Sequence, residues 1–328
     1  MKIGYVFSNL LMGGIQSFFT EIAVSFNESK EVKYTLLDDK LADPILTKRI
    51  DNIERVSKEE LLNWSDIINF DGIINNSDKQ FFKPKWKNTL EYLGSARSYS
   101  IFERIFKPNL SPNIIACSKF VSESLKVSNQ VIYNGKDTNW YKPINLEKKY
   151  DVAIIGRMRP IKNHKLFLDI CELGNFSFVT IGGTHRRLEG HINDIEKMCR
   201  AKARPGIDHV PGFVSDREVV KLINQSRIGL LLTTGPEGGP AGAEFMSCGV
   251  PLIVRDTGGS AELHEELQEL VVPYNAPPDI YVGKIKKYMN DQELPKRARD
   301  TILQKYSRDK TISQFDDLYN NILIKSKK

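Results

Sequence analysis

Two carboxylates flank a loop of small residues in the stretch GPEGGPAGAEFMSCGVP, residues 235–251. Glu237 precedes the loop, and Glu244 opens a short run that the sequence predicts to be helical. A carboxylate only accepts hydrogen bonds, so two of them facing one pocket suit a ligand rich in hydroxyl groups. Unobstructed N–H groups at a helix start suit anionic oxygens. A sugar nucleotide combines both features; the alternative is a surface loop before a capped helix.

A second group of suitable residues is GRMRPIKN, residues 156–163, which follows a predicted strand and precedes a predicted helix. Arg157 offers a planar guanidinium and Lys162 a mobile ammonium, and both suit a diphosphate. Cations at a helix start are disfavoured by the helix dipole, so this placement favours an anionic ligand over surface cations alone. Gly13 and Gly14, after the first predicted strand, indicate a plain turn when they are considered alone.

Strands and helices alternate along the chain and must position these residues. The first half of the pattern predicts a helix over 15–26 and strands at 2–8, 32–37, 67–75, 113–118 and 131–133. The second half predicts helices at 164–173, 188–203, 217–226 and 309–325, and strands at 151–155, 176–181, 228–232 and 252–254. This repetition implies parallel sheets with helices on both faces, whose ligands bind beyond the carboxyl ends of strands.

Length and composition set further bounds. The 328 residues fit two domains of about 150 residues, and 41% hydrophobic with 27% charged residues is a globular composition. No apolar run reaches the ~18–20 residues of a membrane span, and the polar, strand-like start does not read as a signal peptide. The four cysteines are scattered without a CxxC pair, which predicts reduced thiols and a cytoplasmic protein.

The net charge of +6 is mild, but its distribution is uneven. Residues 79–107 hold seven Lys/Arg against two Glu, and aromatic residues interleave with the lysines in KQFFKPKWK. Such a segment fits an anionic membrane surface, a phosphate-bearing acceptor or, less well, a nucleic acid. The alternative is a solvated helix whose aromatic edge faces the core.

Several strings together resemble the retaining glycosyltransferases of the GT-B fold, of the family-4 (glycosyl transferases group 1) type. Residues 244–251 are similar to the family's E-A-M-A-C-G-V-P run, and GRMRPIK to its G-R-x-x-x-x-K. VIYNGKD with WYKP, residues 131–143, is similar to v-I-x-N-G-v-D…F-x-P. PGFVSD and TGGSAEL add two more matches. The family's Glu-x7-Glu signature is shortened, because six residues separate Glu237 from Glu244.

The resemblance implies an α/β fold with two Rossmann-like, doubly wound domains facing a central cleft. We expect a shortened N-terminal, acceptor-side domain over 1–143 and a donor-binding domain over 144–307. A C-terminal helix, 308–328, is expected to pack back on the first domain. The match is loose over 1–30, good over 113–275 and poor over 40–110, where acceptor recognition is expected.

The resemblance also assigns roles to residues. Arg157 and Lys162 would hold the donor's diphosphate, Glu244 the nucleotide ribose, and Glu237 the donor sugar, which makes Arg157, Lys162 and Glu237 the catalytic candidates. The donor-binding candidates are Gly13, Gly14, Arg157, Lys162, Phe213, Val214, Glu237, Gly238, Gly239, Pro240, Ala241 and Glu244. No metal or other cofactor is expected, because two cations replace the metal at a UDP- or GDP-linked donor.

The sequence departs from the family at a histidine that many members place in the first domain. All five histidines lie at or after His164. Asn75, Asn76 and Asp78 are the nearest polar candidates for that place, and His185 is the second-half histidine that merits a test. The acidic pairs at 38–39 and 316–317 are interpreted as solvated rather than metal-binding.

The predicted activity is transfer of a sugar from a nucleoside-diphosphate sugar to a hydroxyl acceptor, with retention. The expected acceptor is a saccharide or a lipid-linked glycan, as in polysaccharide biosynthesis, and peripheral contact with the inner face of a membrane would run through residues 79–107. Two alternatives stay open: a degenerate transferase that only binds sugar nucleotides, and a transferase that glycosylates DNA bases. Nucleic acid is the less favoured partner.

Overall fold

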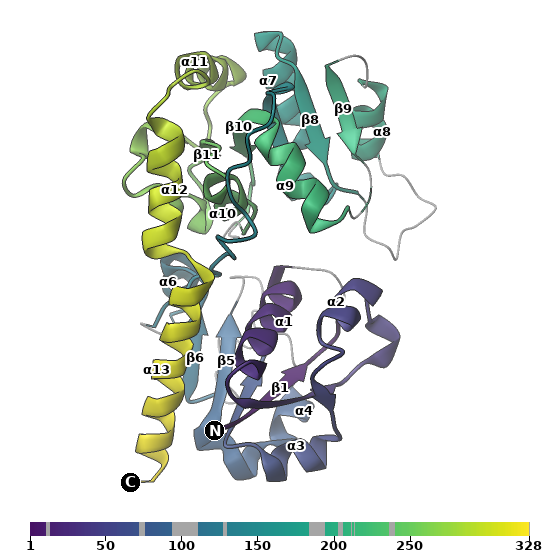
Figure 1. Cartoon of the computed structure of the whole chain (residues 1–328), viewed down its shortest axis with the longest axis vertical. Coiled ribbons are helices and arrows are strands. Elements are labelled where there is room, and N and C mark those ends of the chain that lie inside the picture. Colours follow the sequence, from purple (N-terminus) through teal and green to yellow (C-terminus); the bar gives the residue numbers. More distant parts are fainter. Residues whose placement is uncertain are drawn as a thin grey trace. The chain divides into compact units, whose positions relative to one another are not determined.

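The computed structural model describes residues 1–10, 14–71, 76–93, 111–126, 130–183, 194–202, 206–210, 212, 214–235 and 240–327. The chain divides into two compact units (Figure 1). The first consists of Met1–Asn134 with Asp309–Lys328, and the second of Gly135–Arg308. The sequence analysis placed the first boundary at 143/144 and the second at 307/308.

The described part of the first unit contains a parallel sheet of six strands in the order β3-β2-β1-β4-β5-β6. The strands are β1 (Lys2–Phe7), β2 (Glu31–Leu36), β3 (Glu54–Arg55), β4 (Ile67–Phe70), β5 (Thr89–Leu93) and β6 (Asn113–Ala116). The helices are α1 (Gly14–Asn27), α2 (Pro44–Arg49), α3 (Lys58–Trp64), α4 (Asn76–Phe81), α6 (Lys119–Leu125) and α13 (Arg308–Ser326). The strand expected at 131–133 is absent from this described region except for one isolated bridge from Val131 to Ala116.

Alternation along the strands divides the first core between the two faces of the sheet. Tyr5 and Phe7 of β1 face the larger cluster, which α1, α2 and α13 complete. Val6 faces a smaller cluster with Phe70 and Phe82 on the opposite side, which Leu61 of α3 completes. The apolar run from Tyr5 to Phe7 in β1 follows from this burial on both faces.

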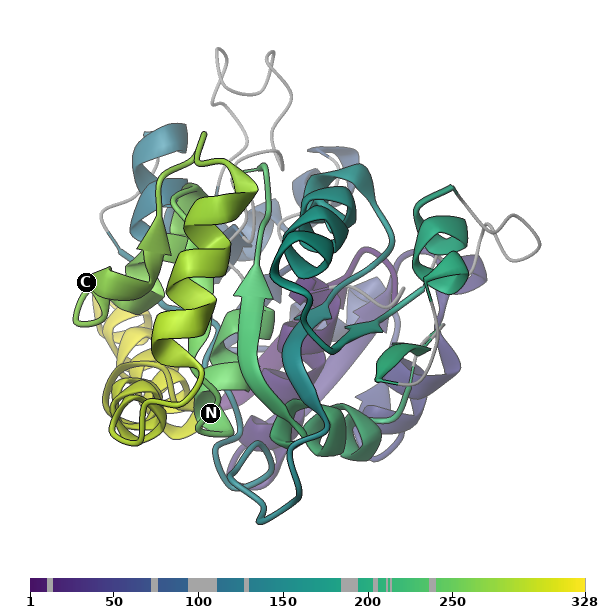
Figure 2. The same ribbon diagram turned by 90° about the horizontal axis from the view of Figure 1, so that it is seen from above.

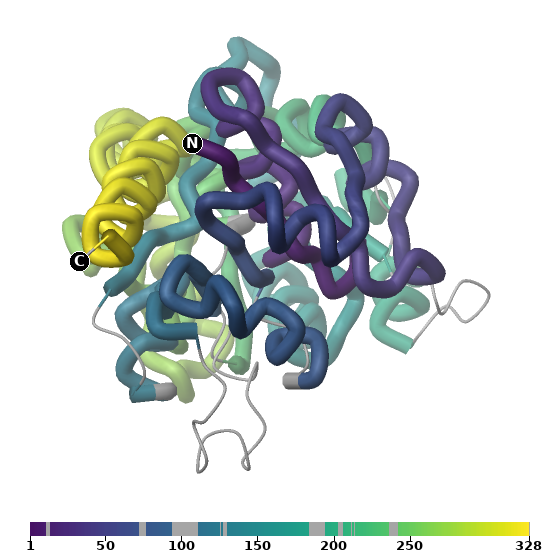
Figure 3. The backbone as a smooth tube through the Cα atoms, turned by 90° about the horizontal axis from the view of Figure 1, so that it is seen from below, coloured from purple at the N-terminus to yellow at the C-terminus, as the bar shows by residue number. Residues whose placement is uncertain are grey.

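The C-terminal helix α13 belongs to this first unit and brings a buried polar contact into it. Tyr319 of α13 donates a hydrogen bond to Oδ1 of Asn69 on β4, at 2.9 Å, and its hydroxyl lies 3.3 Å from that of Tyr5 on β1. Burial raises the pKa of both tyrosines, so both hydroxyls stay neutral and protonated. Figure 3 shows α13 (yellow) beside the N-terminal segments (purple). The predicted return of the last helix is therefore confirmed.

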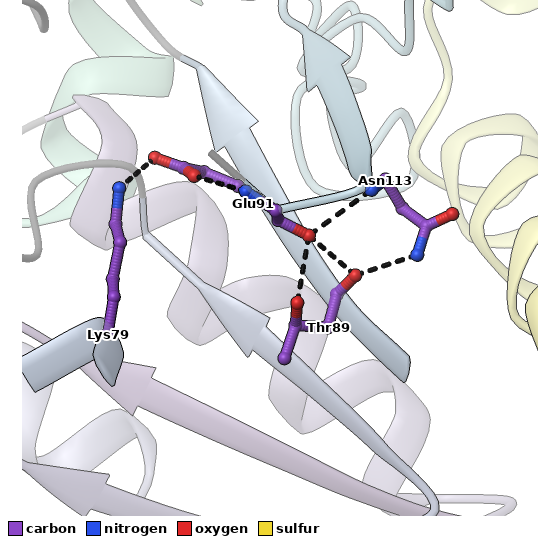
Figure 4. A network of polar contacts seen from close by, with 5 residues as sticks. Lys79, Thr89, Glu91 and Asn113 are labelled. Carbon is purple, nitrogen blue, oxygen red and sulfur yellow. Dashed lines mark hydrogen bonds and ion pairs between the residues drawn. The ribbon is translucent and has the colours of Figure 1, made fainter. Parts of the chain in front are cut away.

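A buried ion pair joins α4 to β5 (Figure 4). Lys79 Nζ lies 2.5 Å from Glu91 Oε1, and their side chains are 5% and 0% exposed. The other carboxylate oxygen accepts a hydrogen bond from the backbone N–H of Ser111 at 3.3 Å, just before β6. Thr89 and Asn113 complete the network around Ser111. The sequence analysis missed β5, because a glutamate and a threonine interrupt its apolar run.

The described part of the basic-aromatic segment follows the second of its two interpretations. Phe82 is fully buried, and Phe81 and Trp86 pack against the same cluster. Lys79 is held by Glu91. The aromatic side chains are therefore core residues and not a surface belt, while residues 94–107 of the segment lie outside the described residues.

In the described residues of the second unit, six parallel strands form a sheet in the order β12-β11-β10-β7-β8-β9. The strands are β7 (Tyr150–Ile155), β8 (Phe178–Ile181), β9 (Ile207–Val210), β10 (Ser226–Leu231), β11 (Leu252–Arg255) and β12 (Val271–Val272). The helices are α7 (His164–Gly174), α8 (Asp194–Ala201), α9 (Asp216–Asn224), α10 (Pro240–Ser247), α11 (Pro278–Tyr288) and α12 (Leu294–Lys305). The predicted α/β fold with two doubly wound sheets is confirmed.

Helices cover both faces of the second sheet. α7 packs against α8 and α11, and Figure 2 shows α7 (dark teal) beside α11 (yellow-green). α10 packs against β10, β11 and α12. The linker before β7 is fastened to this unit, because Ser247 Oγ of α10 donates to the carbonyl of Tyr141 at 2.9 Å and the backbone N–H of Ile144 donates to Asn224 Oδ1 at 2.8 Å. These bonds place residues 135–143 in the second unit rather than the first.

The four cysteines, Cys117, Cys171, Cys199 and Cys248, are all buried, and none of them forms a disulfide with another. Within the described residues, no helix is both long and apolar enough to cross a membrane.

The buried pair generates a stability prediction. Lys79→Met or Glu91→Met alone leaves the partner charge buried, and we expect the free energy of unfolding of the first unit to fall by about 3–5 kcal/mol. The double variant removes both charges and should lose far less. The difference is measured by hydrogen exchange of the β5 amides as a function of urea concentration. Lys165→Met, which breaks an exposed ion pair with Asp169, is the near-neutral control. Additive losses in the double variant would contradict the prediction.

Candidate functional site

The two sequence strings with the relevant chemistry meet at the switch point of the second sheet. The chain runs from β7 outward to β8 and β9 on one side, and from β10 outward to β11 and β12 on the other. The loops after β7 and β10 therefore leave in opposite directions, and open α/β sheets bind their ligands at such a point, beyond the carboxyl ends of the strands. Arg157 and Lys162 follow β7, and the loop before α10 follows β10.

Direct contacts hold these two loops together. The backbone N–H of Thr234, after β10, donates to the carbonyl of Ile161 at 2.9 Å. Ile161 lies in a 3-10 turn, Pro160–Lys162. The Lys162 stem lies across Gly156, where an added Cβ would stand 3.3 Å from its Cγ. The structure thus brings Arg157, Lys162 and the segment after β10 to one place.

Glycine turns extend the sheet beyond its strands and position the Arg157 loop. The backbone N–H of Gly156 donates to Ile181 at 2.9 Å, and that of Met158 donates to Gly183 at 3.1 Å. Gly182 has φ +135°, and a Cβ there would stand 2.1 Å from the carbonyl oxygen of Gly156. A Cβ on Gly183 would stand 2.5 Å from the backbone nitrogen of Gly212. A side chain at Gly182 or Gly183 would collide with the backbone of the neighbouring turn. Only glycine therefore lets the turns after β7, β8 and β9 lie this close together.

The last turn, after β9, leads to the PGFVSD string, which contains the donor-binding candidates Phe213 and Val214. Val214 is half-buried, just before α9, whereas Phe213 lies outside the described residues. Ser215 begins α9 as its cap and accepts a hydrogen bond from the backbone N–H of Glu218 at 3.3 Å.

Glu244 is presented by α10, which lies close to the sheet. An added Cβ on Gly229 of β10 would stand 2.7 Å from the Phe245 ring, so glycine is what admits the helix. Glu244 is 15% exposed, and its Oε1 lies 3.0 Å from Nζ of Lys136, which is equally exposed. α10 begins at Pro240, with Ala241 in its first turn, so Glu244 lies within the helix and not at its start, where the sequence had placed it. The predictions for Glu237, Gly238 and Gly239 lie outside the described residues.

Lys136 is a residue that the sequence analysis missed. It stands in the NGKD string, 108 positions before Glu244, and nothing in local periodicity relates the two. One feature of the sequence could have indicated Lys136: the similar family string has an apolar residue at this position, and this chain has a cation.

Polar residues also gather at the switch point of the first sheet, between β1 and β4. Asp71 is fully buried directly after β4, and its Oδ2 accepts hydrogen bonds from the backbone N–H and Oγ of Ser8, at 2.9 and 2.7 Å. Gly14 begins α1, and Gly13 lies outside the described residues. The sequence analysis missed Asp71, although a carboxylate directly after an apolar strand marks a carboxyl end.

Of the three polar residues proposed to take the place of the family's first-domain histidine, two lie among the described residues. Asn76 is the first residue of α4, and Asp78 of the same helix pairs with Lys58 at 3.2 Å. Asn75, like His185, lies outside the described residues. Among the described residues, no group of three or more His, Cys, Asp or Glu is arranged to hold a metal ion.

His164, at the start of α7, is buried without a hydrogen-bond partner among the described residues for either ring nitrogen. Burial, together with the positive charge of nearby Lys162 and with His209, lowers its pKa to about 4. The ring is therefore neutral at physiological pH.

Glycine at 182 generates a prediction about the Arg157 loop. Gly182→Ala forces a Cβ into the Gly156 carbonyl at a strained φ, so we expect a loss of stability of several kcal/mol or displacement of the loop. Gly283→Ala in α11 is the control, because a Cβ there meets nothing within 4 Å and should stabilise the helix by about 1 kcal/mol. Thermal denaturation of both variants measures these changes. A Gly182→Ala variant as stable as the Gly283→Ala variant would contradict the close approach of Gly182 to the Gly156 carbonyl.

His164 generates a pH prediction. The unfolded chain binds its proton with a pKa of about 6.5, whereas the folded pKa is about 4. The unfolded state therefore binds more protons between these values, and stability falls as pH falls through that window, by at most about 3 kcal/mol. His164→Leu should reduce the loss of stability between pH 7 and pH 4.5, measured by urea denaturation. An unchanged pH dependence would contradict this.

Comparison with known proteins gives the family. The family described as glycosyl transferases group 1 matches residues 136–304, about half of the chain. A glycosyltransferase from Rickettsia africae ESF-5 is similar in structure with a TM-score of 0.79, 17% identity and 98% coverage of both chains. HepE from Anabaena, in complex with UDP and glucose, has a TM-score of 0.76 at 16% identity, over 98% of this chain and 100% of its own.

The lipopolysaccharide outer core galactosyltransferase WaaB has a TM-score of 0.66 at 18% identity, over 100% of both chains. No protein of curated function matches the sequence significantly. At these identities the structural neighbours establish the fold, and the family match establishes membership. The chain belongs to the glycosyl transferases group 1 family and has the GT-B type of fold.

Proposed function

We propose that the protein is a retaining glycosyltransferase that moves a sugar from a nucleoside-diphosphate donor to a hydroxyl acceptor. One observation carries the proposal. The cationic loop with Arg157 and Lys162 and the loop leading to Glu244 leave adjacent strands at the switch point of one sheet, and Thr234 bonds to Ile161 between them. Diphosphate and hydroxyl recognition are thereby combined at one edge of the second unit.

The donor is a UDP- or GDP-linked sugar. HepE, which shares the fold, has been crystallised with UDP and with UDP-glucose, which supports UDP as the first candidate. We propose that no metal ion is required, because Arg157 and Lys162 supply two positive charges where the diphosphate would lie. Turnover should then persist in EDTA.

Transfer would occur on one face of the donor sugar. The bond from the anomeric carbon to the diphosphate oxygen breaks, and a bond to the acceptor oxygen forms on the same side. The acceptor's hydroxyl proton passes to the leaving diphosphate oxygen, so no protein base is needed. Arg157 and Lys162 stabilise the charge that builds on the leaving group, and the protein otherwise orients the reactants.

The two glutamates would bind the donor at either end. Glu244 accepts hydrogen bonds from the ribose hydroxyls, and Glu237 contacts the transferred sugar from the loop before α10. The backbone N–H groups of Gly238, Gly239 and Ala241 would suit anionic oxygens of the donor, whereas Pro240 has no N–H to offer. The shortened spacing to Glu244 makes Glu237 the contact that most needs a direct test.

The acceptor is proposed to be a saccharide or lipid-linked glycan. WaaB, a lipopolysaccharide galactosyltransferase by name, has the same fold and supports this class. A cytoplasmic location at the inner face of a membrane would suit such an acceptor. The described part of residues 79–107 adds no support for membrane contact, because its aromatic side chains face the core.

Variants of the cationic loop test the diphosphate assignment. Arg157→Ala and Lys162→Ala should each lower kcat by about 10²–10³-fold with the fold intact, since each removes a charge that stabilises the leaving group. Arg159→Ala is the matched control, because this exposed arginine lies in the same loop. Activity is measured as donor hydrolysis or transfer, with the product anomer read by NMR. Normal turnover in both variants would overturn the assignment.

Ligand screening separates the rival functions. Thermal shifts against UDP-, GDP-, ADP- and CMP-sugars identify the donor, because a ligand at 100 times its Kd stabilises by about 2.7 kcal/mol. Binding without hydrolysis or transfer would favour a degenerate sugar-nucleotide-binding protein. Salt-sensitive binding to duplex DNA, with a slope that reports several phosphate contacts, would favour a transferase for DNA bases.

A further inference from the structure

Lys136 is fixed by its backbone before its side chain is considered. Its N–H donates to the carbonyl of Tyr306 at 2.9 Å, and its own carbonyl accepts from the N–H of Arg308 at 2.8 Å. Lys136 and Ser307 thus form a parallel bridge in which the two passages of the chain between the units run side by side. The backbone from which the Lys136 side chain extends is therefore held in place on both sides.

The segment after Lys136 is fastened to the helix that carries Glu244. Ser247 Oγ of α10 donates to the carbonyl of Tyr141 at 2.9 Å. The Arg299 guanidinium of α12 donates to the carbonyls of Thr138, at 3.2 Å, and of Ser247. Residues 136–141 are therefore fastened to α10 directly and through Arg299, and these bonds help to set the position of Lys136 relative to Glu244.

The ion pair occupies only part of the carboxylate. Lys136 Nζ lies 3.0 Å from Oε1 of Glu244, and both side chains are 15% exposed. A carboxylate accepts up to about four hydrogen bonds, so one ammonium contact leaves capacity for two ribose hydroxyls. In this mostly buried setting the contact is screened less than a surface pair and restricts the carboxylate's rotation.

We propose that Lys136 is a positioning residue of the donor site, which holds the Glu244 carboxylate in the orientation that accepts the ribose hydroxyls. The proposal rests on the assignment of Glu244 to the ribose in the proposed function. The lysine at this position is a feature of this chain, because the corresponding position in the similar family string is apolar. Lys136 also stands at the chain crossing, so the ribose contact is built on the same backbone that joins the units.

The test compares nucleotides that differ only in the ribose. Binding of UDP and 2′,3′-dideoxy-UDP, and of GDP and its dideoxy analogue, is measured by calorimetry. The wild-type protein should prefer the ribose form by about tenfold or more, since hydrogen bonds to a charged group are at stake. Lys136→Met should lose most of this preference through weaker binding of the ribose form, while binding of the dideoxy form stays unchanged.

Two further variants separate positioning from structural support. Arg308→Met breaks the 2.9 Å pair with Asp137 at the same crossing without touching Glu244, and should keep the preference. Glu244→Gln should lose the preference, and adding Lys136→Met to it should change nothing more.

The outcomes separate failure of the positioning role of Lys136 from failure of the donor-site assignment of Glu244. A Lys136→Met variant with the wild-type preference, or one that weakens both nucleotide forms equally, would overturn the positioning role. A wild-type protein without ribose preference, one whose preference survives Glu244→Gln, or one that binds none of the nucleotides would instead overturn the donor-site assignment itself.

Discussion

The close approach of backbone between consecutive turns at the carboxyl edge of the second sheet is the constraint on which the site depends. Gly182 lies against the carbonyl of Gly156, and Gly183 lies against Gly212. Backbone hydrogen bonds continue past the strand ends into these turns, so the loops are held by the main chain. The Arg157 and Lys162 side chains then extend from a fixed platform, which suits recognition of a diphosphate by geometry as well as charge.

Segments distant in sequence are joined in each unit by polar contacts that are buried or mostly buried. Tyr319 of the last helix reaches Asn69 at the centre of the first sheet, and Lys136 reaches Glu244 in the second unit. A buried polar group without a partner is costly, so each of these contacts favours one arrangement of the elements that carry it. Lys79 and Glu91 act in the same way between α4 and β5, and the carboxylate also orders the chain before β6.

Much of the fold could be read from pattern. The strand–loop–helix at 151–173 and the C-terminal helix were predicted within a few residues, because their apolar periodicities are long and uninterrupted. β5 was missed because Glu91 and Thr89 face a buried network that periodicity does not reveal. The basic-aromatic segment admitted a surface interpretation because the sequence does not say which side of Phe81 and Trp86 faces the core.

The sequence by itself determined the chemistry available to the site: the cations after β7, the glutamate in the run that forms α10, and the glycines at the ends of strands. Residue type and local spacing suffice for this, because hydrogen-bonding capacity and backbone freedom are local properties. Only the tertiary structure decided that Asp71 meets Ser8 and that Lys136 meets Glu244. Each pair joins residues from different elements, and such contacts follow from the strand order and from the packing of helices on the sheet, which no local pattern contains.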